Sequence, residues 1–277
     1  MKAQFKHLAT MTENGQRMAK FYEAAFGMKG LKPDSTPADT TVNVKSKPRA
    51  YTLSDGYVGF NFNSRKPGRP AALDHFGIEV EDTEATCNRI RDKYPKIKIL
   101  KRPSNRPFAA IGTHDPAGNI FDLSQRNMEN RRGLYAADGW SAQRYIDHFV
   151  LRVLDPPAIA RFYQDIFELE DEEKASEDPN FYLTDGRVTM VISAWDITNF
   201  KDTGIERPSM DHVGFKVESI DAVKKDLAKL EDSDPSSAAK PVGVGPEGEA
   251  RLALLATCRY GKFHLSDPDC VFIDIHE

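Results

Sequence analysis

The chain has 277 residues, of which 40% are hydrophobic and 29% charged, a composition typical of a soluble globular protein long enough for two domains. Its net charge of −4 argues against nucleic acid or an anionic membrane as the main partner. No stretch approaches the ~18–20 consecutive apolar residues of a membrane helix, and no secretory signal is evident at the N-terminus, so we expect a cytoplasmic protein without a membrane partner.

Along the chain, four segments with the alternating pattern of a β-strand each begin near a histidine: His7, His75, His148 and His212. In the third of them, HFVLRV, the apolar Phe149, Leu151 and Val153 form one face, and His148 lies on the other. The apolar faces are suited to packing beneath helices. The histidine faces would line a cavity.

A helix is predicted after each of these strands. The second and fourth helices, TEATCNRIRDKY and SIDAVKKDLAKL, begin with Thr83 and Ser219, which are suitable N-caps. Further strands follow each helix, so the order βαβββ occurs four times.

The two halves of the chain repeat each other. Residues 18–29, MAKFYEAAFGMK, align with residues 159–170, IARFYQDIFELE, at the same offset of 141 residues that separates His7 from His148. Three such matches occur in the same order along the chain, which indicates a tandem duplication. We therefore expect an α+β fold with two domains, residues 1–130 and 143–277, joined by the irregular segment Arg126–Arg144.

The other two matches have different offsets. LDHFGIEVED and MDHVGFKVES place His75 and His212 137 residues apart, whereas HDPAGNIFDLSQ and SDPDCVFIDIHE place Asp122 and Asp274 152 residues apart. The second half must therefore contain about fifteen extra residues between the last two matches. The Pro-, Gly- and Ser-rich stretch Asp232–Glu249 is the predicted inserted loop.

Four βαβββ units, a histidine opening the strand, the FYxxxF helices and the ending HDPAGNIFDL together resemble the vicinal oxygen chelate superfamily. That superfamily includes glyoxalases, type I extradiol dioxygenases, fosfomycin-resistance proteins and bleomycin-binding proteins. The resemblance covers nearly the whole chain, although the second ending, SDPDCVFIDI, has Cys270 in place of the glycine. It implies that paired units curl into incomplete barrels, each with a metal in its mouth.

The resemblance also implies the metal ligands. Its carboxylate position falls on Asp122 and Asp274, whereas the matching positions of the first and third units fall on Phe60 and Met190, which cannot bind metal. Each half then offers two histidines and one aspartate, namely His7, His75 and Asp122 in the first and His148, His212 and Asp274 in the second. This donor set suits Fe(II) best and also accommodates Mn(II) or Zn(II).

Other arrangements of these residues stay open. If the first unit pairs with the fourth, the groups become His7, His212 and Asp274 in one site and His75, His148 and Asp122 in the other. A histidine at the start of a strand is also often a local structural residue. One of the two sets can therefore be a remnant of the duplication. The three cysteines are never spaced as CxxC, which favours reduced thiols over a disulfide framework or a thiolate zinc site.

Two residues near the end of the chain are candidates for a catalytic role. His264 lies four residues before Pro268, where extradiol enzymes commonly have a tyrosine, and an imidazole there could transfer protons. Tyr260, next to Arg259, could bind a phenolate or carboxylate of the substrate.

The resulting hypothesis is a metal-dependent oxygenase that resembles type I extradiol dioxygenases and acts on a small vicinal diol or enediol-like, aromatic substrate at the second-half ligands. A redox-neutral lyase or isomerase of the glyoxalase or epimerase type is the alternative, and a small-molecule binding protein is a third. The partner in every case is a small molecule, and a homo-oligomer is compatible with the sequence. Motifs of nucleotide-binding and serine hydrolase enzymes, such as GxGxxG and GxSxG, are absent.

Overall fold

The computed structural model describes residues 3–30, 50–102, 108–126, 142–201 and 203–277. The first half forms one sheet with two helices: β1 (Gln4–Thr12), α1 (Gly15–Phe26), β2 (Lys29–Gly30), β3 (Ala50–Ser54), β4 (Gly59–Ser64), β5 (Ala72–Val80), α2 (Thr83–Lys93), β6 (Leu100–Lys101), β7 (Ile111–His114) and β8 (Ile120–Gln125). These strands lie in the order β2-β3-β4-β1-β5-β8-β7-β6.

The second half repeats this arrangement: β9 (Tyr145–Val153), α3 (Pro156–Phe167), β10 (Glu170–Asp171), β11 (Phe181–Thr184), β12 (Thr189–Ala194), α4 (Ile197–Phe200), β13 (Ser209–Lys216), α5 (Ile220–Ser233), the 3-10 helix Pro235–Ser237, α6 (Gly248–Leu255), β14 (Phe263–Ser266) and β15 (Phe272–His276). Its sheet has the order β10-β11-β12-β9-β13-β15-β14. In the fourth unit an isolated bridge between Lys240 and Ser266 takes the place of a short edge strand. The predicted α+β fold with duplicated units and open sheets is confirmed.

The strand pairing decides which units share a sheet. β1 is antiparallel to β5, and β9 is antiparallel to β13, so the first unit pairs with the second and the third with the fourth. The carboxylate-bearing strands β8 and β15 run parallel to β5 and β13. The alternative pairing of the first unit with the fourth is therefore not the one that the chain adopts.

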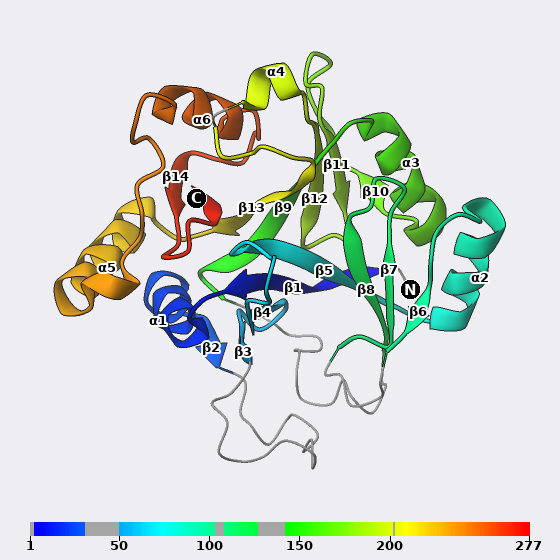
Figure 1. Ribbon diagram of the computed structural model, residues 1–277, viewed down its shortest axis with the longest axis horizontal. Helices are drawn as coiled ribbons and strands as arrows, with labels where there is room; N and C mark the ends of the chain where they lie inside the picture. The colour runs from blue at the N-terminus through cyan, green and yellow to red at the C-terminus, as the bar shows by residue number, and fades with distance from the viewer. Residues whose placement is uncertain (1–2, 31–49, 103–107, 127–141, 202) are drawn as a thin grey trace, which may run out of the picture.

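One hydrophobic core runs through both halves. Its centre is aromatic, where Phe149 of β9 meets Phe5 and Phe76 of the first sheet with ring centroids 5.2 and 5.1 Å apart. Helix α1 lies beside α5, and α2 lies beside α3, on opposite sides of the molecule (Figure 1). The alternation predicted for β9 is confirmed, because Phe149, Leu151 and Val153 all lie in this core.

One of the two predicted N-caps is confirmed. The Ser219 hydroxyl accepts a hydrogen bond of 3.3 Å from the Ala222 N–H at the start of α5. The prediction for α2 is wrong by one residue, because Asp82 is the N-cap in place of Thr83 and accepts two backbone hydrogen bonds of 2.9 Å. The two capping residue types are adjacent in the sequence, and the longer carboxylate reaches both N–H groups.

The inserted segment Asp232–Glu249 is only partly the loop that was predicted. Helix α5 extends to Ser233, a 3-10 helix follows at Pro235–Ser237, and α6 begins at Gly248. The chain then turns back toward the second sheet before β14. The joining segment predicted at Arg126–Arg144 and the adjoining domain limits fall largely on residues 127–141, outside the described residues.

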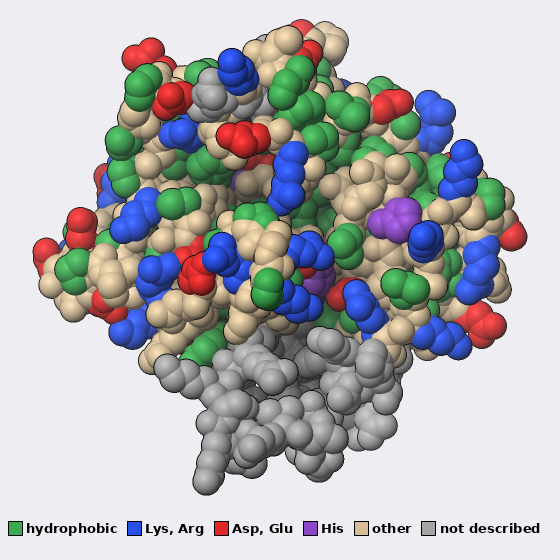
Figure 2. All heavy atoms as spheres, in the orientation of Figure 1, with side chains coloured by type: hydrophobic (Ala, Val, Ile, Leu, Met, Phe, Trp, Pro, Cys, Tyr) green, Lys and Arg blue, Asp and Glu red, His purple; other side chains and the backbone are tan. Residues whose placement is uncertain are grey.

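The surface agrees with the small net charge. Figure 2 shows Lys and Arg side chains distributed over the visible face among Asp and Glu side chains, without one dominant basic patch. In the part of the chain that the structure describes, no helix has the length and apolar character needed to span a membrane.

Candidate metal centres

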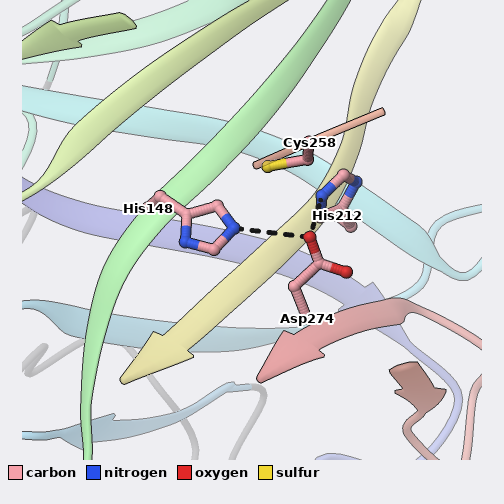
Figure 3. Close-up of side chains that lie close together, drawn as sticks. All are labelled: His148, His212, Cys258 and Asp274. Atoms are coloured by element: carbon pink, nitrogen blue, oxygen red, sulfur yellow. Dashed lines mark ion pairs between the residues drawn. The ribbon is translucent and has the colours of Figure 1, made fainter. Parts of the chain in front are cut away.

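Four potential metal donors meet in the second sheet, and we call them the second-half cluster: His148, His212, Cys258 and Asp274 (Figure 3). Their donor atoms all lie within 4.8 Å of one another. The Asp274 Oδ2 atom is 2.8 Å from His212 Nε2 and 3.5 Å from His148 Nε2. The two imidazoles and the carboxylate are inaccessible to solvent. The structure thus brings together the three second-half residues that the sequence selected.

The donor atoms of this cluster lack hydrogen-bond partners. His148 Nε2, His212 Nε2 and Asp274 Oδ2 are buried, and none is aligned for a hydrogen bond, although they lie close together. Buried polar atoms without partners are costly, because each loses its hydration without replacement. A divalent cation among them would satisfy all three atoms at once. The residues therefore fit a metal.

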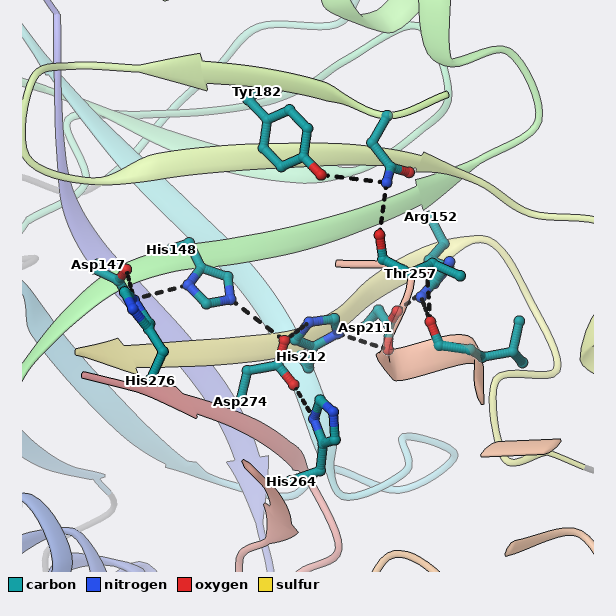
Figure 4. A network of polar contacts seen from close by, with 12 residues as sticks. Asp147, His148, Arg152, Tyr182, Asp211, His212, Thr257, His264, Asp274 and His276 are labelled. Atoms are coloured by element: carbon teal, nitrogen blue, oxygen red, sulfur yellow. Dashed lines mark hydrogen bonds and ion pairs between the residues drawn. The ribbon is translucent and has the colours of Figure 1, made fainter. Parts of the chain in front are cut away.

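Each imidazole lies beside the aspartate that precedes it, but only His148 forms a hydrogen bond with that aspartate. His148 Nδ1 is 2.9 Å from Asp147 Oδ1, whereas His212 Nδ1 is 3.3 Å from Asp211 Oδ1 and is not aligned for a hydrogen bond (Figure 4). A carboxylate on Nδ1 keeps the proton there and leaves Nε2 free to bind metal. The Asp-His dipeptides were visible in the sequence, but this role of the aspartate was missed.

Two glycines make room for the residues around the metal-site histidines. A Cβ atom at Gly214 would lie 1.7 Å from the His148 ring, and one at Gly77 would lie 2.4 Å from the Phe108 ring and 2.8 Å from the Cβ of His7. Each glycine follows a metal-site histidine by two residues and pairs across the sheet with the histidine of the neighbouring unit. Both glycines belong to a D-H-x-G pattern, DHFG at residues 74–77 and DHVG at residues 211–214. In this pattern the histidine is a candidate ligand, and the glycine leaves space for the histidine of the neighbouring unit.

Cys258 was missed as a donor in the sequence. It lies in the turn between α6 and β14, just beyond the inserted segment, and only the fold brings it to the histidines. Burial alone would raise the pKa of its thiol, but His148 and His212 beside it lower the pKa to about 6. The prediction that no thiol belongs to a metal site rested on the absence of CxxC spacing, and the position of this thiol argues against it.

Tyr260 and His264 border the second-half cluster. The Tyr260 ring stacks on His148 with centroids 4.8 Å apart, and its hydroxyl donates to the Glu172 carboxylate. His264 Nδ1 is 2.5 Å from Asp274 Oδ1, the carboxylate oxygen that faces away from His148 and His212 (Figure 4). Both contacts would position donors of the cluster. Their catalytic roles remain predictions.

A second group of three donors, which we call the first-half cluster, lies in the other sheet: His7, His75 and Asp122. The imidazole centroids of the two histidines are 5.3 Å apart, and His75 Nε2 is 3.3 Å from Asp122 Oδ2. Asp74 binds the other nitrogen of His75 at 2.8 Å. Burial alone would lower the pKa of His75, but Asp122 and Asp74 raise it to about 9. A metal would therefore compete with a proton for this nitrogen.

The first-half cluster is more open than the second. The side chains of His75 and Asp122 are 16% and 10% exposed, and in the described residues no fourth donor joins them. Phe108 stacks on His7 with centroids 5.0 Å apart, at the repeat position that Tyr260 occupies beside His148. The Arg102 guanidinium lies 4.0 Å from Asp122.

The strand register moves the carboxylate position of the first and third units by one residue. In β5 and β8, Asp122 pairs with the residue two positions beyond the histidine. The same register puts Asn61 and Val191 at the matching positions of the first and third units, whereas Phe60 and Met190 lie in the hydrophobic core. The assignment of Phe60 and Met190 is wrong by one residue, which moves a side chain to the other face of a sheet. Neither replacement supplies a carboxylate.

The comparisons agree with this architecture. Residues 4–123 match the model of the Glyoxalase/Bleomycin resistance protein/Dioxygenase superfamily. The solved structures described below share the fold of the whole chain, and the second half repeats the first. The family match covers the first half of the chain, and the chain as a whole has the vicinal oxygen chelate fold. The members of this superfamily are mostly metal-dependent enzymes.

Three solved structures illustrate the likeness. The Mn(II)-bound glyoxalase from Novosphingobium aromaticivorans is 12% identical, with a TM-score of 0.63 over 98% of this chain and 81% of that chain. The 2,2',3-trihydroxybiphenyl 1,2-dioxygenase from Sphingomonas wittichii strain RW1 is 12% identical, with a TM-score of 0.63 over 99% and 90%. The 2,3-dioxygenase LapB from Pseudomonas sp. KL28 is 12% identical, with a TM-score of 0.62 over 98% and 91%. No curated protein sequence matches the chain. At such identities the likeness establishes the fold and leaves the reaction open.

Proposed function

We propose that this protein is a metal-dependent oxygenase that acts on a small vicinal diol or enediol-like, aromatic substrate. The observation that carries the proposal is the convergence of two histidines and one aspartate in each half, with donor atoms within 4.8 Å of one another. Two imidazoles and a carboxylate suit Fe(II) or Mn(II) and leave coordination positions for other ligands. Several structural neighbours are named as dioxygenases, which supports this class.

The first-half cluster suits substrate binding better than the second-half cluster. The sequence favoured the second half, but its histidines and aspartate are inaccessible to solvent, whereas in the first half His75 is partly exposed and His7 and Asp122 are nearly buried. A substrate that chelates a metal must reach it directly. We therefore assign the reaction to the first-half cluster.

The surrounding residues of this chain fit such a substrate. Asp74 holds the proton of His75 on Nδ1, so that Nε2 points toward Asp122. The Phe108 ring is buried against His7 and gives the site an apolar wall, and the Arg102 guanidinium can bind an anionic oxygen. When bound, a divalent iron or manganese ion would polarise the substrate oxygens and lower the pKa of a hydroxyl group.

Oxygen uptake tests this proposal. Protein purified without oxygen would be loaded with Fe(II) and mixed with a panel of catechols and non-aromatic enediols while dissolved oxygen is recorded. We expect substrate-dependent uptake that falls by about 100-fold or more in His75→Ala, since even changes to residues that only orient a ligand cost 10–100-fold. The loss should be larger in His75→Ala than in His212→Ala. His114→Ala is a matched control, because the hydrogen bonds of His114 within the described ranges are with the backbone of Lys98 and Asp115.

Two results would contradict the proposal. Turnover that is equally fast without oxygen would replace it with the redox-neutral alternative, and the Mn(II)-bound glyoxalase among the neighbours has the same fold. Stoichiometric binding of the panel without turnover, unchanged in His75→Ala, would identify a small-molecule binding protein.

A further inference from the structure

We propose that Cys258 is the fourth ligand of the second-half cluster, and that this cluster is a closed, zinc-selective site that fastens the turn after α6 to the sheet. The inference goes beyond the proposed oxygenase activity, which we assign to the other half of the chain. It depends on donor geometry, burial and ligand chemistry.

The four donors of this cluster come from separate parts of the second half. His148, His212 and Asp274 lie on β9, β13 and β15, and Cys258 approaches from the turn between α6 and β14 (Figure 3). The nearest oxygen of Asp274 and the Nε2 atoms of both histidines are buried without hydrogen-bond partners. These orphaned atoms and the thiol face one point. Four donors that surround one point match the tetrahedral preference of zinc.

The donor set also selects the metal. A thiolate is a soft ligand that favours zinc over the oxygen-preferring ions, whereas two imidazoles and a carboxylate alone suit Fe(II) or Mn(II). The two halves therefore differ in chemistry although they repeat each other in fold. In the part of the chain that the structure describes, the first-half cluster has no thiol donor.

The site is closed on the side of the thiol. Cys258 packs with Val150, Tyr182 and Val191, and the Tyr260 ring covers His148. Structural zinc sites have four protein ligands and no open position, whereas catalytic sites keep one position for water or substrate. The second-half cluster has the features of the structural class.

A polar shell holds this cover in place. The Glu172 carboxylate accepts hydrogen bonds from Tyr260, Arg259 and Thr189. These contacts join the turn that carries the thiol to β12 and to the segment that follows β10. The cover therefore does not depend on the thiol alone.

The turn that carries Cys258 has further anchors to the sheet. Asn180 donates to the carbonyl of Thr257 at 3.0 Å, and Arg152 donates to the carbonyl of Leu254 at 3.1 Å (Figure 4). These bonds hold the thiol near the histidines before any metal binds. A bound zinc ion would add a connection between this turn and three strands, so we expect it to stabilise the second half.

Cobalt substitution tests the ligand directly, because a thiolate bound to Co(II) produces a charge-transfer band in the near ultraviolet. The full-length protein would be stripped with a chelator and titrated with Co(II). We expect this band in the unmodified protein and in Cys270→Ser, which changes an exposed cysteine. It should be absent in Cys258→Ser and in His212→Ala, and present in His75→Ala, which alters only the other cluster.

Zinc affinity and thermal stability provide a second measurement. Cys258→Ser should weaken zinc binding at the second-half cluster by at least about 10–100-fold, the loss caused even by residues that only orient a ligand. Zinc should raise the unfolding temperature of the unmodified protein and of Cys270→Ser, and have a much smaller effect on Cys258→Ser. Circular dichroism of the metal-free proteins shows whether Cys258→Ser is folded.

The outcomes separate this inference from the proposed activity. A cobalt-loaded protein without a thiolate band, or a band that persists in Cys258→Ser, would overturn the role of Cys258 even if oxygen uptake were found. A thiolate band that depends on Cys258 would support it even if no substrate were turned over.

Discussion

Tyr22, on α1 in the first half, donates a hydrogen bond of 3.0 Å from its hydroxyl to Asp267, which lies in the turn before β15. The repeat reverses this contact, since Tyr163 on α3 donates at 3.1 Å to Asp115 in the turn before β8. The tyrosine of each FYxxxF helix therefore binds the Asp-Pro turn of the other half. The FYxxxF motif and the Asp-Pro motif lie far apart in each repeat. The same contact between tyrosine and aspartate, formed once in each direction, explains both motifs.

A second reciprocal contact connects the strands of the two halves. The backbone N–H of Phe5 donates to Asp185 at 2.6 Å, and that of Ile146 donates to Asp55 at 2.9 Å. Each aspartate lies in the turn that precedes the inner strand of one half, and each N–H belongs to the first strand of the other half. Together with the shared aromatic core, these contacts hold the two sheets in one arrangement and so keep both metal clusters in place.

The first prediction concerns the two tyrosine contacts. Tyr22→Phe and Tyr163→Phe should each lower the free energy of unfolding by about 1–3 kcal/mol, because each leaves a buried carboxylate with one hydrogen bond fewer. Urea denaturation measures the change. Tyr94→Phe is the matched control, since its hydroxyl binds Asp165 in a more exposed place, and its effect should stay below about 1 kcal/mol. Equal losses in all three variants would contradict the buried role.

The second prediction concerns pH. Burial raises the pKa of Asp267 from its usual value of 3.8 to about 7, in spite of the hydrogen bonds from the Val271 N–H and Tyr22. Between these two values the folded protein retains a proton that the unfolded chain has lost. The contribution of Asp267 to the free energy of unfolding is therefore present at low pH and decreases as the pH rises toward 7, by up to about 1.4 kcal/mol per pH unit.

Asp267→Asn cannot titrate and should remove this part of the slope. Urea denaturation between pH 5 and about 8 would measure it, within the usual range of maximal stability. Asp165→Asn serves as the control, because Asp165 also binds a tyrosine but is exposed at the surface. An unchanged slope in Asp267→Asn would show that this carboxyl is ionised throughout the range.

The third prediction concerns the glycines of the D-H-x-G pattern. Gly214→Ala places a methyl group where the His148 imidazole lies, so the ring must move and the second-half cluster should lose its metal. We expect destabilisation of about 1–3 kcal/mol, the usual cost of overpacking. Gly30→Ala is the control, because the nearest atoms to its added carbon would be 3.8 Å away. Elemental analysis and urea denaturation measure the two effects, and normal metal content in Gly214→Ala would contradict this account.

The sequence predicts the residues that depend on local pattern. Alternation in the strands puts each histidine opposite the apolar face, and the repeat offsets identify the two aspartates. The carboxylate position in the first unit was missed by one residue, because strand register depends on pairing with β1 that no local pattern reveals. Cys258 was missed for a similar reason, since it lies in the turn between α6 and β14 and only the fold brings it to the histidines. Contacts between distant segments required the fold.

The last prediction locates the reaction in one half of the chain. Arg102 lies beside Asp122 as His264 lies beside Asp274, and the two acids hold equivalent positions in the repeat. If substrate binds at the first-half cluster, Arg102→Ala should raise KM for an anionic substrate by about 10-fold, the loss of one charge-assisted hydrogen bond of about 1.5 kcal/mol. His264→Ala should lower turnover less than Arg102→Ala lowers kcat/KM. Steady-state kinetics, with metal content measured on the same samples, test both variants.

A loss of turnover in His264→Ala that exceeds its loss of metal would instead place the reaction at the second-half cluster and give His264 the proton-transfer role that the sequence predicted.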